Sequence, residues 1–279
     1  MVIKFDPGLY IVAGPIGNLS DLTPRAAELL RNADIIAVED SRVSAKLLRH
    51  AGSERPMVAY HDHSSEKLRT QLVERMASEA VALLSDAGTP LISDPGYKLV
   101  RDARAAGRFV TTLPGPSAAI AALTLSGLPT DRFLFIGFLS AKAKARGDAL
   151  GEIAAVRATL IFYESGPRLA DSLGAMAEVL GDRDAAVVRE ISKTFEETVT
   201  GRLSELSARY VDAPPKGEIV VVVAPPGEAP PPSQEDSDAA LREAMERLPV
   251  SKAAGEVAKA LGLDRRALYA RAMILKSEV

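Results

Sequence analysis

Short apolar runs rich in Val, Ile and Leu alternate along the chain with segments of helical periodicity, and this alternation restricts the fold more than any other feature. In the first part of the chain the predicted strands are 9–13, 34–38, 57–60, 80–84 and 109–113. The predicted helices between them are 24–32, 43–51, 64–78 and 96–106. Such alternation is typical of a mostly parallel sheet with helices on both faces. Ligands bind to these sheets beyond the carboxyl ends of the strands.

A Pro- and Gly-rich hinge, LPGPS at 113–117, precedes a second α/β pattern. A helix at 117–126 begins this pattern. The further strands are predicted at 133–138, 158–163, 185–190, 195–200 and 217–224, and the helices at 142–155, 167–180 and 203–210. We therefore predict an α/β fold with two domains, 1–114 and 115–224, of which the second has a more mixed sheet.

The last part of the chain changes character again. Residues 225–238 contain five prolines and four acids without apolar periodicity, which predicts a linker. A small helical tail is predicted at 239–279. Its last two helices are separated by Gly262, and Ser251 and Asp264 are their predicted N-caps.

Composition excludes several functional classes. With no cysteine among 279 residues, the chain has no disulfide, thiolate nucleophile or Cys-ligated metal. No apolar run is long enough to span a membrane, and the N-terminus lacks the pattern of a signal peptide, so we expect a cytoplasmic protein without a membrane partner. The net charge of −3 means that any nucleic acid must bind to a local basic patch.

The first strand ends in the glycine loop GPIGNL. It departs from the dinucleotide fingerprint, because more loop follows before the helix starts. Either a bent backbone around a ligand or an ordinary turn explains Gly14 and Gly17.

The next two strand ends carry titratable groups. Glu39, Asp40 and Arg42 in VEDSR form either a ligand site or a capped helix with a surface ion pair. His61 in YHDHS suits substrate contact or base chemistry better than a metal site, because too few further ligands are present.

The fourth strand runs into SDAGTPLISDPG, where two glycines and two prolines shape the backbone. Asp94 precedes Pro95 and Gly96, a pattern that predicts a helix N-cap. Asp86 has no such structural role in the sequence. A carboxylate at that position suits a ligand with a positive charge or ribose hydroxyls.

The segments GPIGNLSDLTPRA, ADIIAVEDSR, SDAGTPLISDPGYKLV, PGPSAAIAAL, SGLPTDRFLFIGFL, TLIFYES, REISKTFEE and KGEIVVVV occur in this order, and together the chain resembles the ribosomal RNA small-subunit methyltransferase I family. That family belongs to the tetrapyrrole methylase superfamily. The resemblance covers residues 8 to 224 and implies two α/β domains with S-adenosylmethionine in the cleft between them. It also implies a homodimer that methylates the ribose 2′-hydroxyl of a cytidine in small-subunit (16S) ribosomal RNA, free or in a ribosomal particle.

The resemblance also implies which residues bind the cofactor. They are Pro15, Asp86, Ala87, Gly88, Thr89, Pro114, Ser117, Ala118, Tyr163, Gly217, Glu218 and Ile219. The chain departs from the family at Gly14 and Ser41, where Thr is usual, and at ESGPR, where the family's ESPHR has a histidine. That histidine is therefore not available as a base here.

Methyl transfer to a hydroxyl needs alignment and a proton acceptor, but no metal. The candidate bases are Glu39, Asp40, His61, Asp62, His63, Lys193 and Glu196. We favour the acidic pair 39–40 with Arg42 as substrate orienter, and Lys193 qualifies only with a lowered pKa.

Basic residues at 132–168 are the predicted contacts for RNA phosphates, chiefly Lys142, Lys144, Arg146 and Arg168. A solvated helix face is the alternative for this segment. A sister methylase acting on a tetrapyrrole or a protein side chain is the alternative enzyme, and a non-catalytic ribosome-assembly factor is the alternative outside enzymes.

Overall fold

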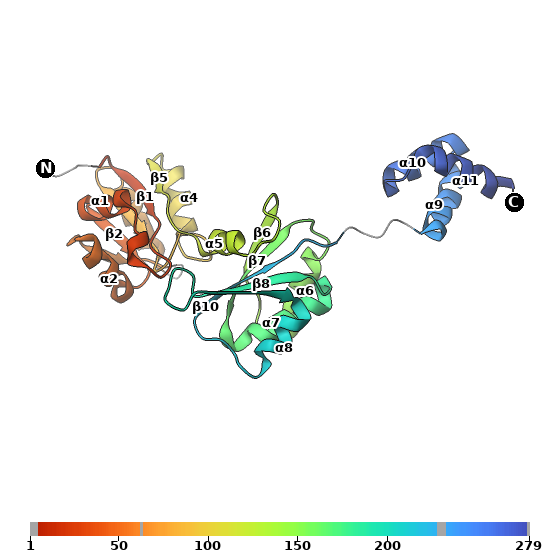
Figure 1. The fold of residues 1–279 in the computed structure, drawn as a ribbon. Helices are drawn as coiled ribbons and strands as arrows, with labels where there is room; N and C mark the ends of the chain where they lie inside the picture. The colour runs from red at the N-terminus through yellow and green to blue at the C-terminus, as the bar shows by residue number, and fades with distance from the viewer. Residues whose placement is uncertain (1–4, 62–63, 228–232, 278–279) are drawn as a thin grey trace. The chain divides into compact units, whose positions relative to one another are not determined.

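The computed structural model describes residues 5–61, 64–227 and 233–277 (Figure 1). Contacts within the chain define two compact units, Met1–Pro226 and Gly227–Val279. The first unit contains two five-stranded sheets, and the second is helical. In the described parts of the chain, no helix has the length and apolar character needed to cross a membrane.

The first sheet is entirely parallel and has the strand order β3-β2-β4-β1-β5. Its strands are β1 (Gly8–Val12), β2 (Ile35–Val38), β3 (Met57–Ala59), β4 (Ala80–Leu84) and β5 (Val110–Leu113). The central strands β4 and β2 are buried throughout, as expected for a sheet covered on both faces. All the strand ends that carry loops 13–23, 39–41 and 85–96 therefore meet at one edge.

Helices cover both faces of this sheet, as the sequence predicted. α1 (Pro24–Asn32) and α2 (Ser41–Ala51) pack their leucines against Tyr10 and Val12. α3 (Glu66–Arg75) and α4 (Tyr97–Ala105) pack theirs against Leu9 and Leu83 on the other face. A short 3-10 helix, η1 (Leu19–Asp21), lies in the loop after β1.

The second sheet is mixed, with the order β6-β7-β10-β8-β9. Its strands are β6 (Phe133–Phe138), β7 (Thr159–Ser165), β8 (Asp184–Arg189), β9 (Glu197–Arg202) and β10 (Glu218–Val223). Only β6 and β7 pair in parallel. The last strand in the chain, β10, lies between β7 and β8, so its amino end comes beside the carboxyl end of β7.

One face of the second sheet is covered by α6 (Ala143–Ile153), α7 (Leu169–Leu180) and α8 (Leu203–Val211). The other face packs on α5 (Ala118–Leu125), which follows the PGP segment. A 3-10 turn, η2 (Gly166–Arg168), joins β7 to α7. The mixed character predicted for this sheet is confirmed, and the strand ends lie within one or two residues of the predicted ones.

The helical unit contains α9 (Gln234–Arg247), α10 (Val250–Leu261) and α11 (Arg265–Ser277) around an Ala- and Leu-rich core. The segment predicted as linker is too long, because α9 begins at Gln234, where Ser233 and Asp236 form a capping box. The predicted cap Ser251 is wrong, because it lies inside α10. Asp264 is confirmed as a cap, since it accepts hydrogen bonds from the amides of Arg266 and Ala267.

Candidate functional site

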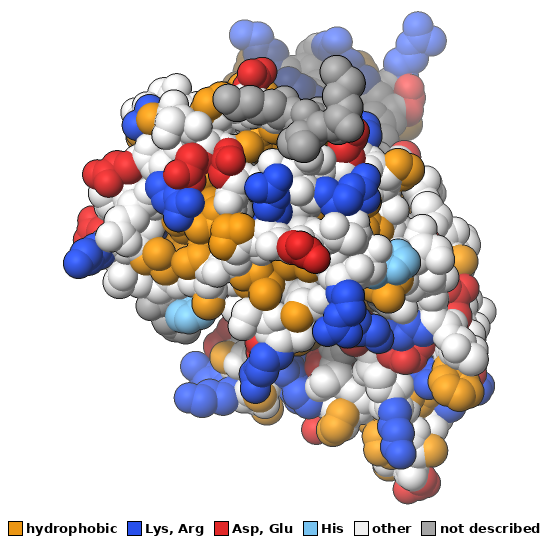
Figure 2. Space-filling view, turned by 90° about the vertical axis from the view of Figure 1, so that its left-hand side faces the viewer, with side chains coloured by type: hydrophobic (Ala, Val, Ile, Leu, Met, Phe, Trp, Pro, Cys, Tyr) orange, Lys and Arg blue, Asp and Glu red, His pale blue; other side chains and the backbone are white. Residues whose placement is uncertain are grey.

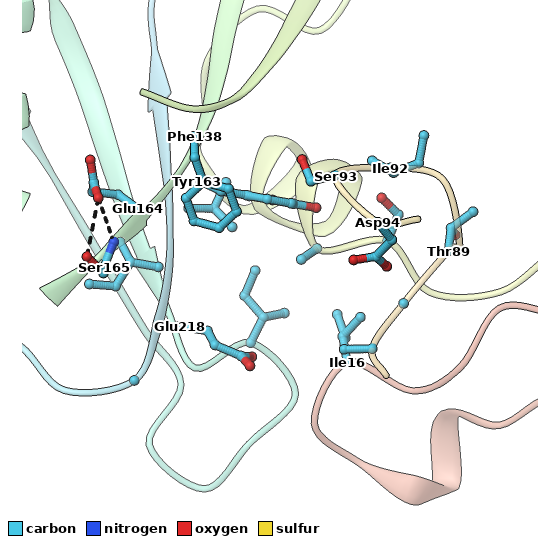
Figure 3. A pocket seen from close by; sticks show the side chains of 18 residues that line it. Ile16, Thr89, Ile92, Ser93, Asp94, Phe138, Tyr163, Glu164, Ser165 and Glu218 are labelled. Carbon is cyan, nitrogen blue, oxygen red and sulfur yellow. Dashed lines mark hydrogen bonds between the residues drawn. The ribbon is translucent and has the colours of Figure 1, made fainter. Parts of the chain in front are cut away.

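The loop after β4, residues 85–96, has an unusual backbone. Leu91 and Ser93 have φ angles of 73° and 63°, in the left-handed region that side chains rarely adopt. Gly96, with φ 128°, is the N-cap residue of α4, so the N-terminus of this helix has no hydrogen bond from a capping side chain. The prediction that Asp94 caps this helix is therefore wrong. Its carboxylate instead lines a cavity (Figure 3).

This cavity, which we call the main cavity, has a volume of about 350 Å³. Loops at the edge of the first sheet and the adjoining ends of β7 and β10 line it together. The predicted cofactor residues that line it are Ala87, Gly88, Thr89, Ser117, Ala118, Tyr163, Gly217, Glu218 and Ile219. Cavities of this size hold a small ligand or cofactor.

The main cavity is apolar with acidic groups. Ile16, Ile92 and Phe138 supply apolar walls, and Phe138 packs edge-to-face on Tyr163 with ring centroids 5.5 Å apart. The charged residues among its described lining are Asp94, Glu164 and Glu218, and this lining contains no Lys, Arg or His. Its charge therefore favours a ligand that is cationic.

The three carboxylates differ in their partners. Glu164 is only 3% exposed and accepts hydrogen bonds from the Ser172 hydroxyl and the Ser165 amide. Glu218 pairs with Lys193, whose Nζ lies 3.0 Å from its Oε2. No ion pair between described residues involves Asp94.

Asp94 also has an altered acidity. Burial and the negative charges of Glu39 and Asp86 raise its pKa from 3.8 to about 6, although the nearby Ser85 side chain acts in the opposite direction. Across the cavity the Tyr163 side chain points toward Asp94 (Figure 3). Burial also raises the pKa of this phenol. The site thus holds a carboxyl group that changes its charge near neutral pH.

A second cavity of about 230 Å³ shares Ile16, Ala87 and Glu218 with the main cavity. Lys46 and Lys193 line it, so it contains the positive charge that the main cavity lacks. The predicted cofactor residues Pro15 and Asp86 lie here, whereas Pro114 lines neither cavity.

Asp86 holds two strand-end loops together. Its Oδ1 accepts hydrogen bonds from the Asp40 amide and the Ser44 hydroxyl, each at 3.3 Å. The structural role that the sequence did not reveal for Asp86 is therefore to bind the N-terminus of α2.

Lys193 lies where the glycine loop comes closest to the second sheet. A Cβ on Gly17 would come within 2.4 Å of Lys193 Cγ, so only glycine fits there. Burial lowers the pKa of Lys193, but its hydrogen bonds to Glu190 and Glu218 outweigh this effect, and the pKa is raised. A raised pKa is the opposite of what a lysine base requires.

The acidic pair favoured from the sequence lies outside both cavities. Asp40 caps α2 through the Arg42 amide and pairs with the Arg42 guanidinium at 2.6 Å. Hydrogen bonds from Arg42 lower the pKa of Asp40 to about 2. Glu39 acts on the site through its charge on Asp94. His61 also lines neither cavity, and Asp62 and His63 lie outside the described residues.

The predicted RNA contacts fall into two groups. Lys142 and Lys144 lie exposed at the start of α6, where the Lys144 side chain is 93% exposed. Arg146 is half-buried in the same helix. Arg168 is used within the fold, since it donates to the Leu139 carbonyl and lies 3.4 Å from buried Glu164.

Several lining residues had no signal in the sequence analysis. Ile16, Ile92 and Phe138 are apolar residues that any core could use. Ser93 and Asp94 were hidden by the Asp-Pro-Gly pattern, which equally well begins a helix. Leu91 and Ser93 have left-handed φ angles, which set the path of this segment. The sequence could not predict these angles, because leucine and serine rarely adopt them.

Comparison with known proteins identifies the family. The model of the Tetrapyrrole (Corrin/Porphyrin) Methylases matches residues 8–207, and that of the RsmI C-terminal HTH domain matches residues 231–276. A protein of Erythrobacter litoralis named Ribosomal RNA small subunit methyltransferase I is 57% identical over 97% of this chain and 96% of its own. Its namesake from Mesorhizobium japonicum is 52% identical over 97% of this chain and 93% of its own.

Solved structures share the fold at lower identity. Diphthine synthase matches with a TM-score of 0.61 and 19% identity, covering 77% of this chain and 89% of its own. Uroporphyrin-III C-methyl transferase from Thermus thermophilus, complexed with S-adenosylhomocysteine, matches with a TM-score of 0.53 and 23% identity, covering 78% of this chain and 97% of its own. The chain therefore belongs to the tetrapyrrole methylases and, within them, to the family of ribosomal RNA small subunit methyltransferase I.

Proposed function

We propose that the protein transfers a methyl group from S-adenosylmethionine to the ribose 2′-hydroxyl of a cytidine in small-subunit ribosomal RNA. The names of its relatives support ribosomal RNA as the substrate. The observation that carries the choice of donor is the main cavity, which is lined by carboxylates and by no cation among its described residues. A sulfonium ligand suits such a lining.

The residues present fit this cofactor. Apolar Ile16, Ile219 and Val220 suit an adenine ring, and the carboxylate of Glu218 suits a cationic group of the cofactor. The Thr89 hydroxyl donates to the Pro116 carbonyl at 3.0 Å and so fixes the loop against the hinge. When bound, the cofactor supplies an activated methyl group, so the chain's own residues need only position the hydroxyl and accept its proton.

The negatively charged phosphates of the RNA require basic side chains at the surface of the protein. On the face shown in Figure 2, the coloured Lys and Arg side chains are interspersed with acidic and hydrophobic ones. Lys46 in the second cavity, beside the main one, suits a phosphate next to the reacting ribose, whereas Lys193 there is paired with Glu190 and Glu218. Lys142 and Lys144 suit more distant phosphates, whereas Arg168 already has partners in the fold. The homodimer and the cytoplasmic location remain predictions.

The test is transfer of tritium from labelled S-adenosylmethionine to purified small ribosomal subunits that lack the modification, followed by nucleoside analysis. We expect the label in 2′-O-methylcytidine. Label on a base, or on another nucleoside, would contradict the proposed atom or residue. Cofactor binding without any labelled RNA would favour a tetrapyrrole or protein substrate, and absence of cofactor binding would favour an assembly factor.

A parallel reaction with naked ribosomal RNA tests the form of the substrate. Because the chain is acidic overall, we expect assembled subunits to be methylated faster than free RNA. Equal rates would contradict this expectation while leaving the reaction itself unaffected.

A further inference from the structure

We propose that Asp94 is the catalytic residue that accepts the proton of the ribose hydroxyl. This assignment rests on the proposed function and deepens it, because it names the group that accepts the proton. The Asp94 carboxylate lies in the wall of the main cavity, on the loop that also contributes Gly88 and Thr89.

The backbone around Asp94 is built to hold it there. Leu91 and Ser93 adopt left-handed conformations on one side, and Pro95 fixes φ on the other. Non-glycine residues in such conformations cost about 1–3 kcal/mol each and persist where the surrounding structure enforces them. The result is a carboxylate that does not cap the following helix and instead faces the cavity and Tyr163 (Figure 3).

The other acidic groups of the site are already engaged. Glu164 accepts hydrogen bonds from Ser172 and Ser165, and Glu218 pairs with Lys193. Asp86 lies at the second cavity and accepts from the Asp40 amide and the Ser44 hydroxyl. Among the described carboxylates that line the main cavity, Asp94 is the one without an ion pair.

The surroundings of Asp94 suit proton transfer near neutral pH. The titratable groups that face it are Glu39 at the end of β2, Asp86 at the end of β4, Tyr163 on β7 and Glu218 on β10. Burial, Glu39 and Asp86 place its pKa at about 6. A base with a pKa close to the working pH is both deprotonated and able to take a proton.

The ribose oxygen forms a bond to the methyl carbon while the carbon–sulfur bond breaks and its electron pair stays on sulfur. The hydroxyl proton passes to the Asp94 carboxylate and later to water. No oxidant, reductant or metal ion takes part in this step.

The test compares Asp94→Asn with the wild-type protein on small ribosomal subunits. We expect kcat to fall by about 100-fold or more, the range for loss of a positioned base, while the Kd of S-adenosylmethionine stays within about threefold. The wild-type rate should rise with pH through about 6, and this acidic limb should vanish in the variant. Asp94→Glu, which keeps the carboxylate, should have a higher rate than Asp94→Asn, and its rate should again rise with pH on the acidic side.

The control is Asp212→Asn, which neutralises an exposed carboxylate at the end of α8 and should leave kcat and Kd unchanged. Circular dichroism and a melting curve show whether each variant folds. Weakened cofactor binding that accounts for the whole loss of rate would make Asp94 a cofactor ligand and overturn the proposal. An unchanged kcat would also overturn it. If the wild-type protein labels no RNA, the proposed function itself fails.

Discussion

The two halves of the loop after β4 contain similar residues and use them differently. In the first half, 85–89, hydrogen bonds hold the chain in place: Gly14 donates to the Gly88 carbonyl at 2.8 Å, and the Ser85 hydroxyl donates to the same carbonyl at 3.1 Å. In the second half, 91–96, left-handed residues turn Asp94 into the main cavity. The first half thus shapes the cavity with its backbone, and the second half supplies a reactive side chain.

The two aspartates of this loop show what the difference teaches. Asp86 follows a buried strand and was predicted to bind a ligand; it lines the second cavity and accepts hydrogen bonds from the Asp40 amide and the Ser44 hydroxyl. Asp94 was predicted to be a helix cap, but it faces the main cavity. The role of a carboxylate depends on which donors the tertiary fold brings within reach, and motif spacing does not report that.

A large loss of activity is also expected from a change in the first half of the loop, 85–89. Gly88→Ala places a Cβ 3.1 Å from Ile16 Cγ2 at a φ of 68°. Displacing this wall of the cavity should lower kcat/KM by about 100-fold, since small misplacements at a reacting centre have effects of that size. The rate of methyl transfer at low cofactor concentration measures it.

Gly107→Ala is the matched control. Gly107 has almost the same φ, 67°, but a Cβ there would meet nothing within 4 Å. Both variants should lose about 1 kcal/mol of stability from the left-handed backbone, and only Gly88→Ala should lose activity. Equal activities would show that the first half of the loop does not shape the site.

The next prediction concerns the free energy of unfolding, on which Asp94 and Asp86 should have opposite effects. Because the folded-state pKa of Asp94 lies above its usual 3.8, at about 6, its ionisation opposes folding. Its contribution to stability is complete below about pH 4 and is lost as the pH rises through about 6. The shift corresponds to at most about 3 kcal/mol, and we expect about 1–2 because solvent reaches the cavity.

Asp94→Asn should therefore raise the free energy of unfolding at pH 7.5 by about 1–2 kcal/mol and leave it unchanged at pH 4. Asp86→Asn should lower it by about 1 kcal/mol at pH 7.5, because an amide serves the Asp40 amide and the Ser44 hydroxyl less well than a carboxylate. Urea titrations at the two pH values measure both changes. If Asp94→Asn instead destabilised the protein at pH 7.5, the two aspartates would not differ in their effect on stability.

The smallest effect is expected at the acidic pair first favoured as catalytic. Asp40→Asn keeps an oxygen that can accept from the Arg42 amide and loses only a solvent-exposed ion pair. Turnover should stay within about threefold of wild type, since exposed pairs contribute little. A loss as large as that of Asp94→Asn would return the base to the end of β2.

Much of the fold was predictable because its signals are local. Buried strands such as 80–84 and capped helices such as the one after Thr23 have the periodicity and end residues that sequence shows directly. The insertion of β10 between β7 and β8 was not predictable, because strand order depends on contacts far apart in the chain.

The parts of the candidate site that consist of backbone segments were predictable from the sequence. The glycine-rich and hinge segments Gly88, Ser117 and Gly217 were predicted and line the main cavity. The base proposed above was not predictable, since the proposal depends on ion pairs that occupy Asp40 and Lys193 and leave Asp94 without one. Residue types identify groups that can react, whereas partners in space determine which of them are available.

In the proposed reaction, methyl transfer removes a positive charge inside a cavity whose described lining holds carboxylates and no cation. The spent cofactor, S-adenosylhomocysteine, has a neutral thioether where the donor has a sulfonium. The electrostatic attraction that favours the donor is therefore absent for the product, and we expect the product to bind more weakly. Release of the product would then be favoured by the loss of this attraction.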